Sequence, residues 1–158
     1  SYLLRPHRSG DMGWVVARHG ALYPAEYGWD NRIEALTAEI VATFLKNFDP
    51  AREKCWIAEI DGEPVGSVFL VRDKGDVARI RLLIVDPKAR GLGIGKRLVE
   101  ECVRFAREAG YRKITLWTHG VLKAARAIYQ QAGFQLVKEW VHDDFGKPEP
   151  AETWELTL

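Results

Sequence analysis

The sequence contains little sulfur: among its 158 residues there are two cysteines and one methionine. Cys55 and Cys102 are too few and too far apart for a disulfide framework or a cysteine-based zinc site. Both stand in apolar stretches, where a buried, reduced thiol is the expected state. The cysteine pattern therefore predicts a protein of the cytoplasm, where thiols stay reduced.

Charge of one sign and long apolar runs are also absent. Basic and acidic residues are interspersed and the formal net charge is +1, so the one-sided basic field of a protein that contacts nucleic acid or anionic lipid directly is missing. No apolar stretch has the length of a membrane span, and the first residues lack a signal-peptide pattern. His142 and its two neighbouring aspartates have no second ligand at a metal-binding spacing, so no metal is expected.

The composition that remains is typical of one globular domain. The apolar fraction is 47% and the charged fraction is 28%, which suits a chain that buries a single hydrophobic core. Residues 1–158 are therefore interpreted as one domain that mixes helices and strands.

Hydrophobic periodicity predicts strands and helices without strict βαβ repetition. Asp11 is expected to cap a first helix that ends near Pro24, and Asp61-Gly62 is expected to form the turn of a β-hairpin. The strand 77–85 is expected to have a fully buried end. The predicted strands are 2–5, 55–60, 65–72, 77–85, 114–118, 134–141 and 153–158, and the predicted helices are 11–24, 31–48, 94–109 and 121–132.

A glycine-rich loop is the most informative stretch of the chain. It joins an apolar strand to an amphipathic helix, and its three glycines let the backbone approach a ligand closely. The helix that starts there offers unpaired amide groups and the positive end of its dipole to an anion. Two basic residues add charge, so the loop predicts a phosphate site formed by Arg90, Gly91, Leu92, Gly93, Ile94, Gly95 and Lys96.

Spacing separates the known phosphate-binding patterns. A nucleoside-triphosphate loop needs a glycine at position 90 and a Ser or Thr at position 97, but both positions are arginine. A dinucleotide fingerprint fits poorly because the glycines fall at 91, 93 and 95, and a tight turn before a helix is the plainer alternative. The pattern Arg/Gln-x-x-Gly-x-Gly/Ala fits without mismatch, and it resembles the pyrophosphate loop of the GNAT acetyltransferases, which bind acetyl-coenzyme A (acetyl-CoA).

A second motif strengthens this resemblance. The segment 124–134, which contains Tyr129, Gly133 and Phe134, is similar to the A-x-x-x-Y-x-x-x-G-F segment of the same family. The resemblance extends over essentially the whole chain. The opening segment also looks like a bacterial subgroup in which this domain follows a MarR-type winged-helix regulator, and in that case the DNA-binding half is absent here.

The resemblance implies a fold and an activity. The expected fold is a GNAT-like α+β fold, with a mixed, mostly antiparallel, splayed sheet of about six to seven strands and about four helices. The expected activity is transfer of acetyl from acetyl-CoA to a primary amine of a small molecule or protein. A ligand-sensing domain of a regulator and, more distantly, a nicotinamide-dependent oxidoreductase stay open. The implied coenzyme contacts beyond the glycine loop are Leu83, Ile84, Val85 and Arg126.

The resemblance also implies roles for reacting side chains. Tyr129 matches the family tyrosine that donates a proton to the departing thiolate, and a phenol with a pKa near 10 is protonated at neutral pH; alternatively it only packs its helix against the sheet. Glu26 is a candidate base. His119 stands where many relatives have Asn, and it either hydrogen-bonds the pantetheine or acts as a base.

An aromatic wall for the acceptor is expected from residues that the family places beside it. Such a wall holds an ammonium or aryl group. The segment Asp143-Asp144-Phe145 is expected to overhang the same side, and strands at the C-terminus are expected to pair in a homodimer. The expected wall consists of Tyr23, Tyr27, Trp29 and Trp117.

Overall fold

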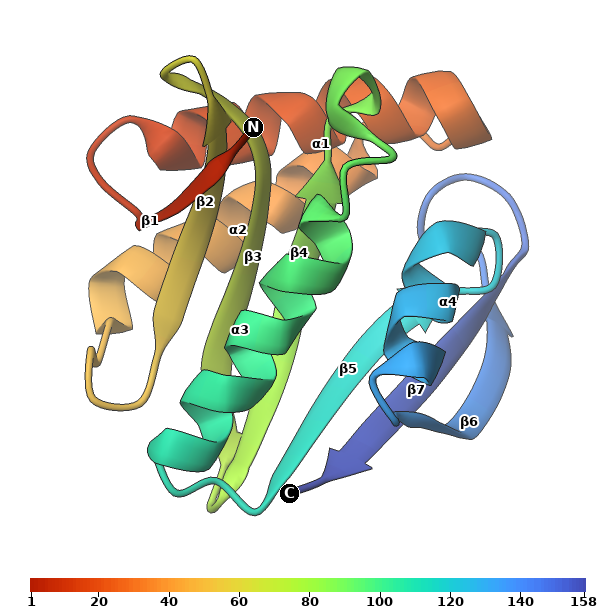
Figure 1. Ribbon diagram of the computed structural model, residues 1–158. Helices are drawn as coiled ribbons and strands as arrows, with labels where there is room; N and C mark the ends of the chain where they lie inside the picture. The colour runs from red at the N-terminus through yellow and green to blue at the C-terminus, as the bar shows by residue number, and fades with distance from the viewer.

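The computed structural model describes residues 1–158 and contains one seven-stranded mixed sheet with four α-helices (Figure 1). Its strand order is β1-β2-β3-β4-β5-β7-β6, and every neighbouring pair is antiparallel except β4 and β5. The expected mixed, mostly antiparallel α+β fold is confirmed. The elements are β1 Leu3–Pro6, α1 Asp11–Tyr27, α2 Arg32–Asn47, β2 Lys54–Ile60, β3 Glu63–Lys74, β4 Val77–Val85, a 3₁₀ turn Pro87–Ala89, α3 Ile94–Glu108, β5 Lys113–His119, α4 Lys123–Gln131, β6 Gln135–His142 and β7 Glu149–Thr157.

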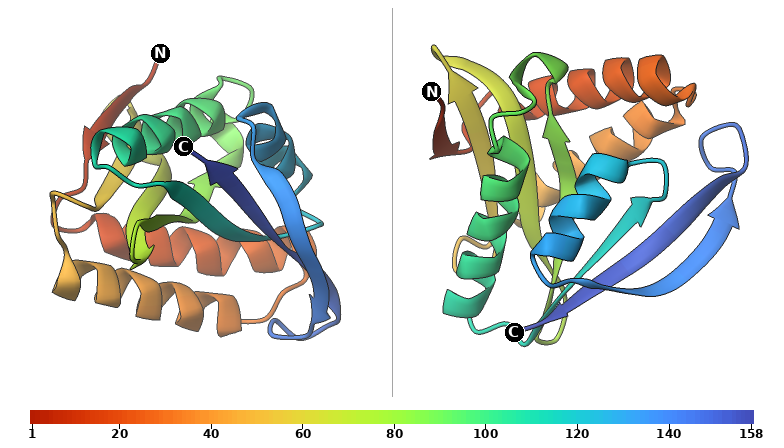
Figure 2. Two further views of the ribbon diagram at one scale, coloured as in Figure 1. Left: turned by 90° about the horizontal axis from the view of Figure 1, so that it is seen from below. Right: turned by 45° about the vertical axis from the view of Figure 1, so that its right-hand side comes forward.

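Two helical layers cover the two faces of the sheet (Figure 2). The side chains of β2 pack alternately against the two helical layers, because successive side chains of a strand point to opposite faces. Cys55 and Ile57 pack with α1 and α2, while Trp56 and Ala58 pack in the larger core beneath α3. Cys102 of α3 is also buried, and burial raises the pKa of both thiols. Both cysteines are therefore unreactive core residues.

The sheet splits between β4 and β5. Residues Val77–Ile80 of β4 pair with residues Lys113–Leu116 of β5. Beyond Ile80 and Leu116 the two strands diverge (Figure 1). Opposite the split, β4 carries a bulge, since Ser67 pairs with Ile84 while Phe69 pairs with Arg81. The second half of β4 therefore presents one backbone edge without a strand partner.

The start of α1 corrects the prediction for Asp11. Gly10, with φ of 95°, is the N-cap, and Asp11 is the first helical residue. Its carboxylate is buried and accepts hydrogen bonds from the Arg5 guanidinium. The ion pair with Arg5 holds Asp11 at the first position inside the helix, so Asp11 is not the cap. The N-cap position is taken by Gly10, which adopts the positive φ of the turn into α1.

Pro24 does not end the first helix, contrary to the prediction. The α1 helix continues to Tyr27 and is closed by Gly28, whose N–H donates to the Pro24 carbonyl. Proline removes one donor, but its fixed φ is helical, and a glycine in the left-handed region completes the last turn.

Two further predictions for strands were wrong. The end of β4 is half-buried rather than fully buried, because Leu82, Leu83 and Val85 border open space at the split. The last strand begins at Glu149 rather than near residue 153, because Glu149 already pairs with His142, the last residue of β6. None of the helices combines the length and apolar character needed to cross a membrane.

Candidate functional site

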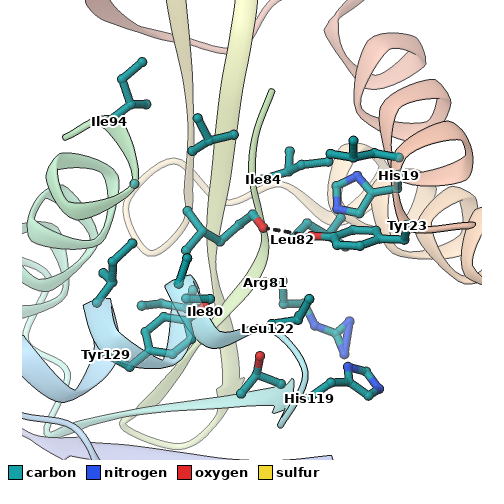
Figure 3. A pocket seen from close by; sticks show the side chains of 18 of the residues that line it. His19, Tyr23, Ile80, Arg81, Leu82, Ile84, Ile94, His119, Leu122 and Tyr129 are labelled. Atoms are coloured by element: carbon teal, nitrogen blue, oxygen red, sulfur yellow. Dashed lines mark hydrogen bonds between the residues drawn. The ribbon is translucent and has the colours of Figure 1, made fainter. Parts of the chain in front are cut away.

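A cleft of about 660 Å³ opens where β4 and β5 part (Figure 3). It is bordered by α1 and α2 on one face of the sheet and by α3 and α4 on the other, so it runs through the sheet. The split therefore brings together most of the residues predicted from sequence: Tyr23, Tyr27, Trp29, Leu83, Ile84, Val85, Arg90, Gly91, Gly93, Ile94, Gly95, Lys96, Trp117, His119 and Tyr129.

The glycine loop presents free amide groups at one end of the cleft. No backbone N–H from Gly91 to Lys96 donates to a protein acceptor, and the first bond into α3 runs from the Arg97 N–H to the Gly93 carbonyl. Gly91 and Gly93 have φ values of 83° and 78°, which side-chain-bearing residues rarely adopt. These amides and the positive end of the α3 dipole form a site suited to an anion.

The three loop glycines have different reasons to lack a side chain. A Cβ at Gly91 or Gly93 would meet nothing within 4 Å, so those positions leave open space. A Cβ at Gly95 would lie 2.8 Å from Cδ1 of Ile128 in α4. Gly95 therefore lets α3 and α4 approach each other, while Gly91 and Gly93 shape the loop.

Three predicted site residues lie outside the cleft lining: Glu26, Leu92 and Arg126. The Glu26 carboxylate lies 2.6 Å from the Arg90 guanidinium, and Arg126 donates to Glu152 at 2.8 Å. Leu92 is exposed at the tip of the loop. Because the Arg90 guanidinium is already paired with Glu26, the backbone amides of the loop and Lys96 are more available than Arg90 to bind an anion.

Tyr129 lies on the α4 side of the cleft and is 4% exposed. Its ring packs against Phe134, with centroids 5.8 Å apart. Burial raises the pKa of the phenol above its usual value, so the hydroxyl keeps its proton across the physiological range. The structure thus combines the two predicted features, packing and a protonated hydroxyl bordering the cleft.

Tyr23 connects α1 to the unpaired half of β4. Its hydroxyl donates to the Leu83 carbonyl at 3.4 Å, a bond drawn in Figure 3. Its ring stacks on Trp29 with centroids 5.2 Å apart, and Tyr27 lies 5.7 Å from the same indole. The predicted aromatic wall is therefore a contiguous cluster.

Phe145 and His119 extend this cluster. Phe145, from the segment between β6 and β7, stacks on Trp29 at 4.8 Å, and the His119 ring lies 4.7 Å from the same indole. The Trp29 Nε1–H donates to the buried Glu149 carboxylate at 3.2 Å, which fixes the ring. The sequence motif around Asp143 pointed to this segment, but it is the phenylalanine and not the aspartates that closes the cleft.

His119 and His142 form a directly hydrogen-bonded pair. Their Nε2 atoms lie 2.8 Å apart, and the Asp144 N–H donates to Nδ1 of His142 at 3.2 Å. In the tautomer in which His142 Nδ1 accepts this bond, His142 donates from Nε2 to His119, whose own proton then lies on Nδ1. The Asp144 carboxylate lies 3.3 Å from the same Nδ1. Burial and the neighbouring His142 lower the pKa of His119 to about 4, so the ring is neutral near pH 7.

Arg81 is a cleft residue that the sequence reasoning missed. It lines the cleft beside its strand neighbour Arg79, and burial lowers its pKa, although a guanidinium remains charged. The signal was present in β4, where Arg79 and Arg81 alternate with apolar residues. That alternation alone does not reveal that the strand leaves its neighbour after Ile80.

Comparison with known proteins gives a consistent result. A family model described as "Acetyltransferase (GNAT) family" matches residues 19–134. An uncharacterized N-acetyltransferase of Methanocaldococcus jannaschii is 34% identical over 95 residues, covering 54% of this chain and 42% of that protein. Human N-acetyltransferase 8 is 32% identical over 117 residues, covering 70% and 52%. The chain thus spans about half the length of these curated relatives.

Solved structures share the fold. The crystal structure of a phosphinothricin acetyltransferase from Sinorhizobium meliloti, in complex with AcCoA, superposes with a TM-score of 0.78. Sequence identity is 19%, and the match covers 99% of this chain and 88% of that one. At this identity the likeness concerns the fold.

Proposed function

This chain belongs to the acetyltransferase (GNAT) family, and on that premise we propose that it transfers an acetyl group from acetyl-CoA to the primary amine of a small molecule or protein. The observation that carries the proposal is the row of unpaired amides from Gly91 to Lys96 at the mouth of a cleft that also exposes the free edge of β4. One domain, residues 1–158, would contain both binding sites.

The residues of the cleft suit the parts of acetyl-CoA. The loop amides and Lys96 would hold the pyrophosphate, because they offer donors and positive charge where no side chain intervenes. The backbone of Leu83, Ile84 and Val85 would hydrogen-bond the pantetheine amides, since that edge lacks a strand partner and its Leu83 carbonyl is engaged only by the Tyr23 hydroxyl at 3.4 Å. The coenzyme supplies the acetyl group as a thioester.

The proposed step forms one bond and breaks another. The neutral amine nitrogen attacks the thioester carbonyl carbon, the C–N bond forms, and the C–S bond breaks. Tyr129 gives its phenolic proton to the departing sulfur, the proton lost by the amine passes to water, and water returns a proton to the Tyr129 phenolate. Holding the two reactants together supplies roughly 7–11 kcal/mol of the barrier reduction, so few chemical groups are required.

His119 is proposed as a hydrogen-bond donor and not as the base. Its Nε2 accepts a hydrogen bond from His142, and its Nδ1–H has no partner within the protein. A ring whose pKa is lowered to about 4 removes protons from ammonium groups poorly. The earlier prediction that Glu26 is the base stays a prediction, and its carboxylate is engaged by Arg90.

Calorimetric titration with acetyl-CoA tests the proposal, with NADH and ATP as competing probes. We expect saturable binding of acetyl-CoA alone, and its loss in Gly93→Trp, which fills the open space at the loop. Gly110→Trp is the matched control, because Gly110 has φ of 87°, equally open surroundings and a place at the opposite end of α3. Binding that survives Gly93→Trp, or a preference for NADH, contradicts the proposal.

Three wider predictions also stay proposals. They are a cytoplasmic location, fusion to a winged-helix regulator, and a homodimer. The support for pairing of two copies is that β6 is an edge strand with exposed Leu136, Val137 and Val141.

A further inference from the structure

The cleft contains an arginine without an ion-pair partner. Of the arginines that line it, Arg79 lies 3.4 Å from Asp73 and Arg90 lies 2.6 Å from Glu26. Arg81 is half-buried and forms no hydrogen bond or ion pair within the protein, and the carboxylate that acts on it, Asp73, is paired with Arg79. No aspartate or glutamate lines the cleft. A partly desolvated guanidinium in such a place is complementary to a ligand anion.

The position of Arg81 separates it from the loop that would bind pyrophosphate. Arg81 precedes the bulge of β4, and residues Leu82–Val85, which lack a partner in β5, and the 3₁₀ turn lie between it and that loop. The partner strand β3 advances three residues, from Phe69 to Gly66, between Arg81 and Val85, and at about 3.3 Å per residue this separates Arg81 from the end of β4 by roughly 10 Å. The anion that complements Arg81 is therefore a different group.

The pleat of the sheet places Arg81 on the face of the aromatic cluster. Ile80 and Leu116 are the last pair between β4 and β5, and both are buried in the core under α3 and α4. Their successors, Arg81 and Trp117, consequently project to the α1–α2 face. Figure 3 shows the Arg81 side chain extending toward His119 and Leu122, on the side of the cleft away from Ile94.

The same end of the cleft is lined by apolar side chains. Trp117 packs against the cluster of Trp29, Ile33 and Phe145, and Leu36 and Ile40 of α2 border the same space. Phe145 borders it and stacks on Trp29. An occupant that complements this end therefore combines an anionic group for Arg81 with an apolar body, and a cleft of about 660 Å³ that it shares with the coenzyme suits a small molecule.

We propose that the acceptor is a small primary amine that also carries a carboxylate and an apolar or aromatic side chain, and that Arg81 binds the carboxylate. This inference rests on the proposed acetyl transfer. The carboxylate oxygens accept hydrogen bonds from the guanidinium, the side chain packs on the Trp29–Trp117 cluster, and the amine is directed to the split between β4 and β5.

Paired acceptors test the proposal through release of the coenzyme thiol. The carboxylate-bearing probes are L-phenylalanine and L-tryptophan, and their decarboxylated counterparts are phenethylamine and tryptamine. We expect kcat/KM to favour the amino acids by about 10- to 100-fold, the factor that a charge-assisted hydrogen bond supplies. Arg81→Gln should reduce that ratio to about one and leave acetyl-CoA binding intact, while Arg81→Lys should retain part of it. Arg72→Gln is the charge-matched control, because Arg72 is exposed and lies outside the cleft lining, and it should keep the wild-type ratio.

Each contrary outcome overturns the proposal in an identifiable way. Equal turnover of the paired probes by the wild-type chain removes the role of the carboxylate, whatever the variants do. Preserved discrimination in Arg81→Gln assigns the carboxylate to another group. A chain that binds acetyl-CoA but neither acetylates nor binds either amino acid contradicts the substrate class. Failure of the proposed function itself is distinct, because acetyl-CoA would then not bind.

Discussion

The hydroxyl groups of two buried tyrosines face different surroundings. Tyr111 and Tyr129 belong to the same hydrophobic core and are each 4% exposed. The Tyr111 hydroxyl donates to the Arg52 carbonyl at 2.7 Å, whereas Tyr129 borders the cleft. Their burial is matched, so a comparison between them separates packing from chemistry.

Tyr129→Phe should lower kcat by about 100-fold or more, the usual range for loss of a general acid. The phenyl ring keeps the packing against Phe134, so the calorimetric affinity for acetyl-CoA should stay within a factor of about three. Steady-state thiol release measures kcat. Tyr111→Phe is the control and should leave kcat unchanged. An unchanged kcat in Tyr129→Phe would remove the proposed acid, whereas a domain that only senses its ligand would show no turnover and would keep its ligand response in the variant.

The site residues that could be predicted from sequence are those whose function follows from local spacing. The loop from Arg90 to Lys96 is one such case, since glycines before a helix specify free amides regardless of the rest of the fold. The direction of a charged side chain is not local: Glu26 is aimed at Arg90, and Arg126 at Glu152, by contacts between distant segments. Arg81 became visible as a site residue only with the split.

At the scale of elements, one guanidinium ties β1 to α1 and β2. Arg5 donates to both carboxylate oxygens of Asp11, at 2.8 and 2.9 Å, and also to Glu59 of β2. Asp11 is 5% and Glu59 is 8% exposed. The Arg5 guanidinium holds the pKa of Asp11 below its usual value, against the opposing effect of burial.

Arg5→Met should destabilise the protein by about 3–5 kcal/mol, because removal of one partner leaves buried carboxylates without a counter-charge. Urea unfolding followed by circular dichroism measures the loss. Arg8→Met is the control: Arg8 also contacts Glu59, but at 3.5 Å and with its side chain 66% exposed. It should cost less than about 1 kcal/mol. Similar losses in the two variants would contradict the assignment.

Elements with strong local signals were predicted well. The hairpin around Asp61-Gly62 is confirmed, and β4 has the predicted bounds, 77–85. The first helix shows where local reasoning fails. Asp11 has the chemistry of a cap but is recruited by Arg5, and Pro24 has the chemistry of a helix end but is followed by a glycine cap at Gly28. In both cases a tertiary contact or a later cap outweighs the local preference.

For the whole molecule, acid should be destabilising well above the pH at which carboxylates titrate. His19 and His119 are buried, and burial lowers the pKa of each from 6.5 to about 4. The unfolded chain therefore binds these protons first as the pH falls. Stability should decrease from about pH 6.5 down to about pH 4, by up to about 3 kcal/mol for each histidine.

Urea unfolding at pH 7.5 and pH 4.5 measures this decrease, and a variant isolates one contribution. His19 Nδ1–H donates to the Val15 carbonyl at 2.7 Å, so His19→Gln keeps a neutral donor and removes the titration. The difference in unfolding free energy between the two pH values should shrink by about 2 kcal/mol or more in His19→Gln. An equal difference in both proteins would show that His19 titrates normally in the folded state.

The short ladder between β4 and β5 also divides the sheet into two unequal blocks of strands. Only the four residue pairs from Val77–Lys113 to Ile80–Leu116 connect the β1–β4 half of the sheet to the β5–β7 half by strand pairing, while a continuous hydrophobic core joins the two halves. In the proposed complex, the coenzyme bound along the free edge of β4 would take the place of the missing strand neighbour. The sheet would then be completed by the substrate of the enzyme.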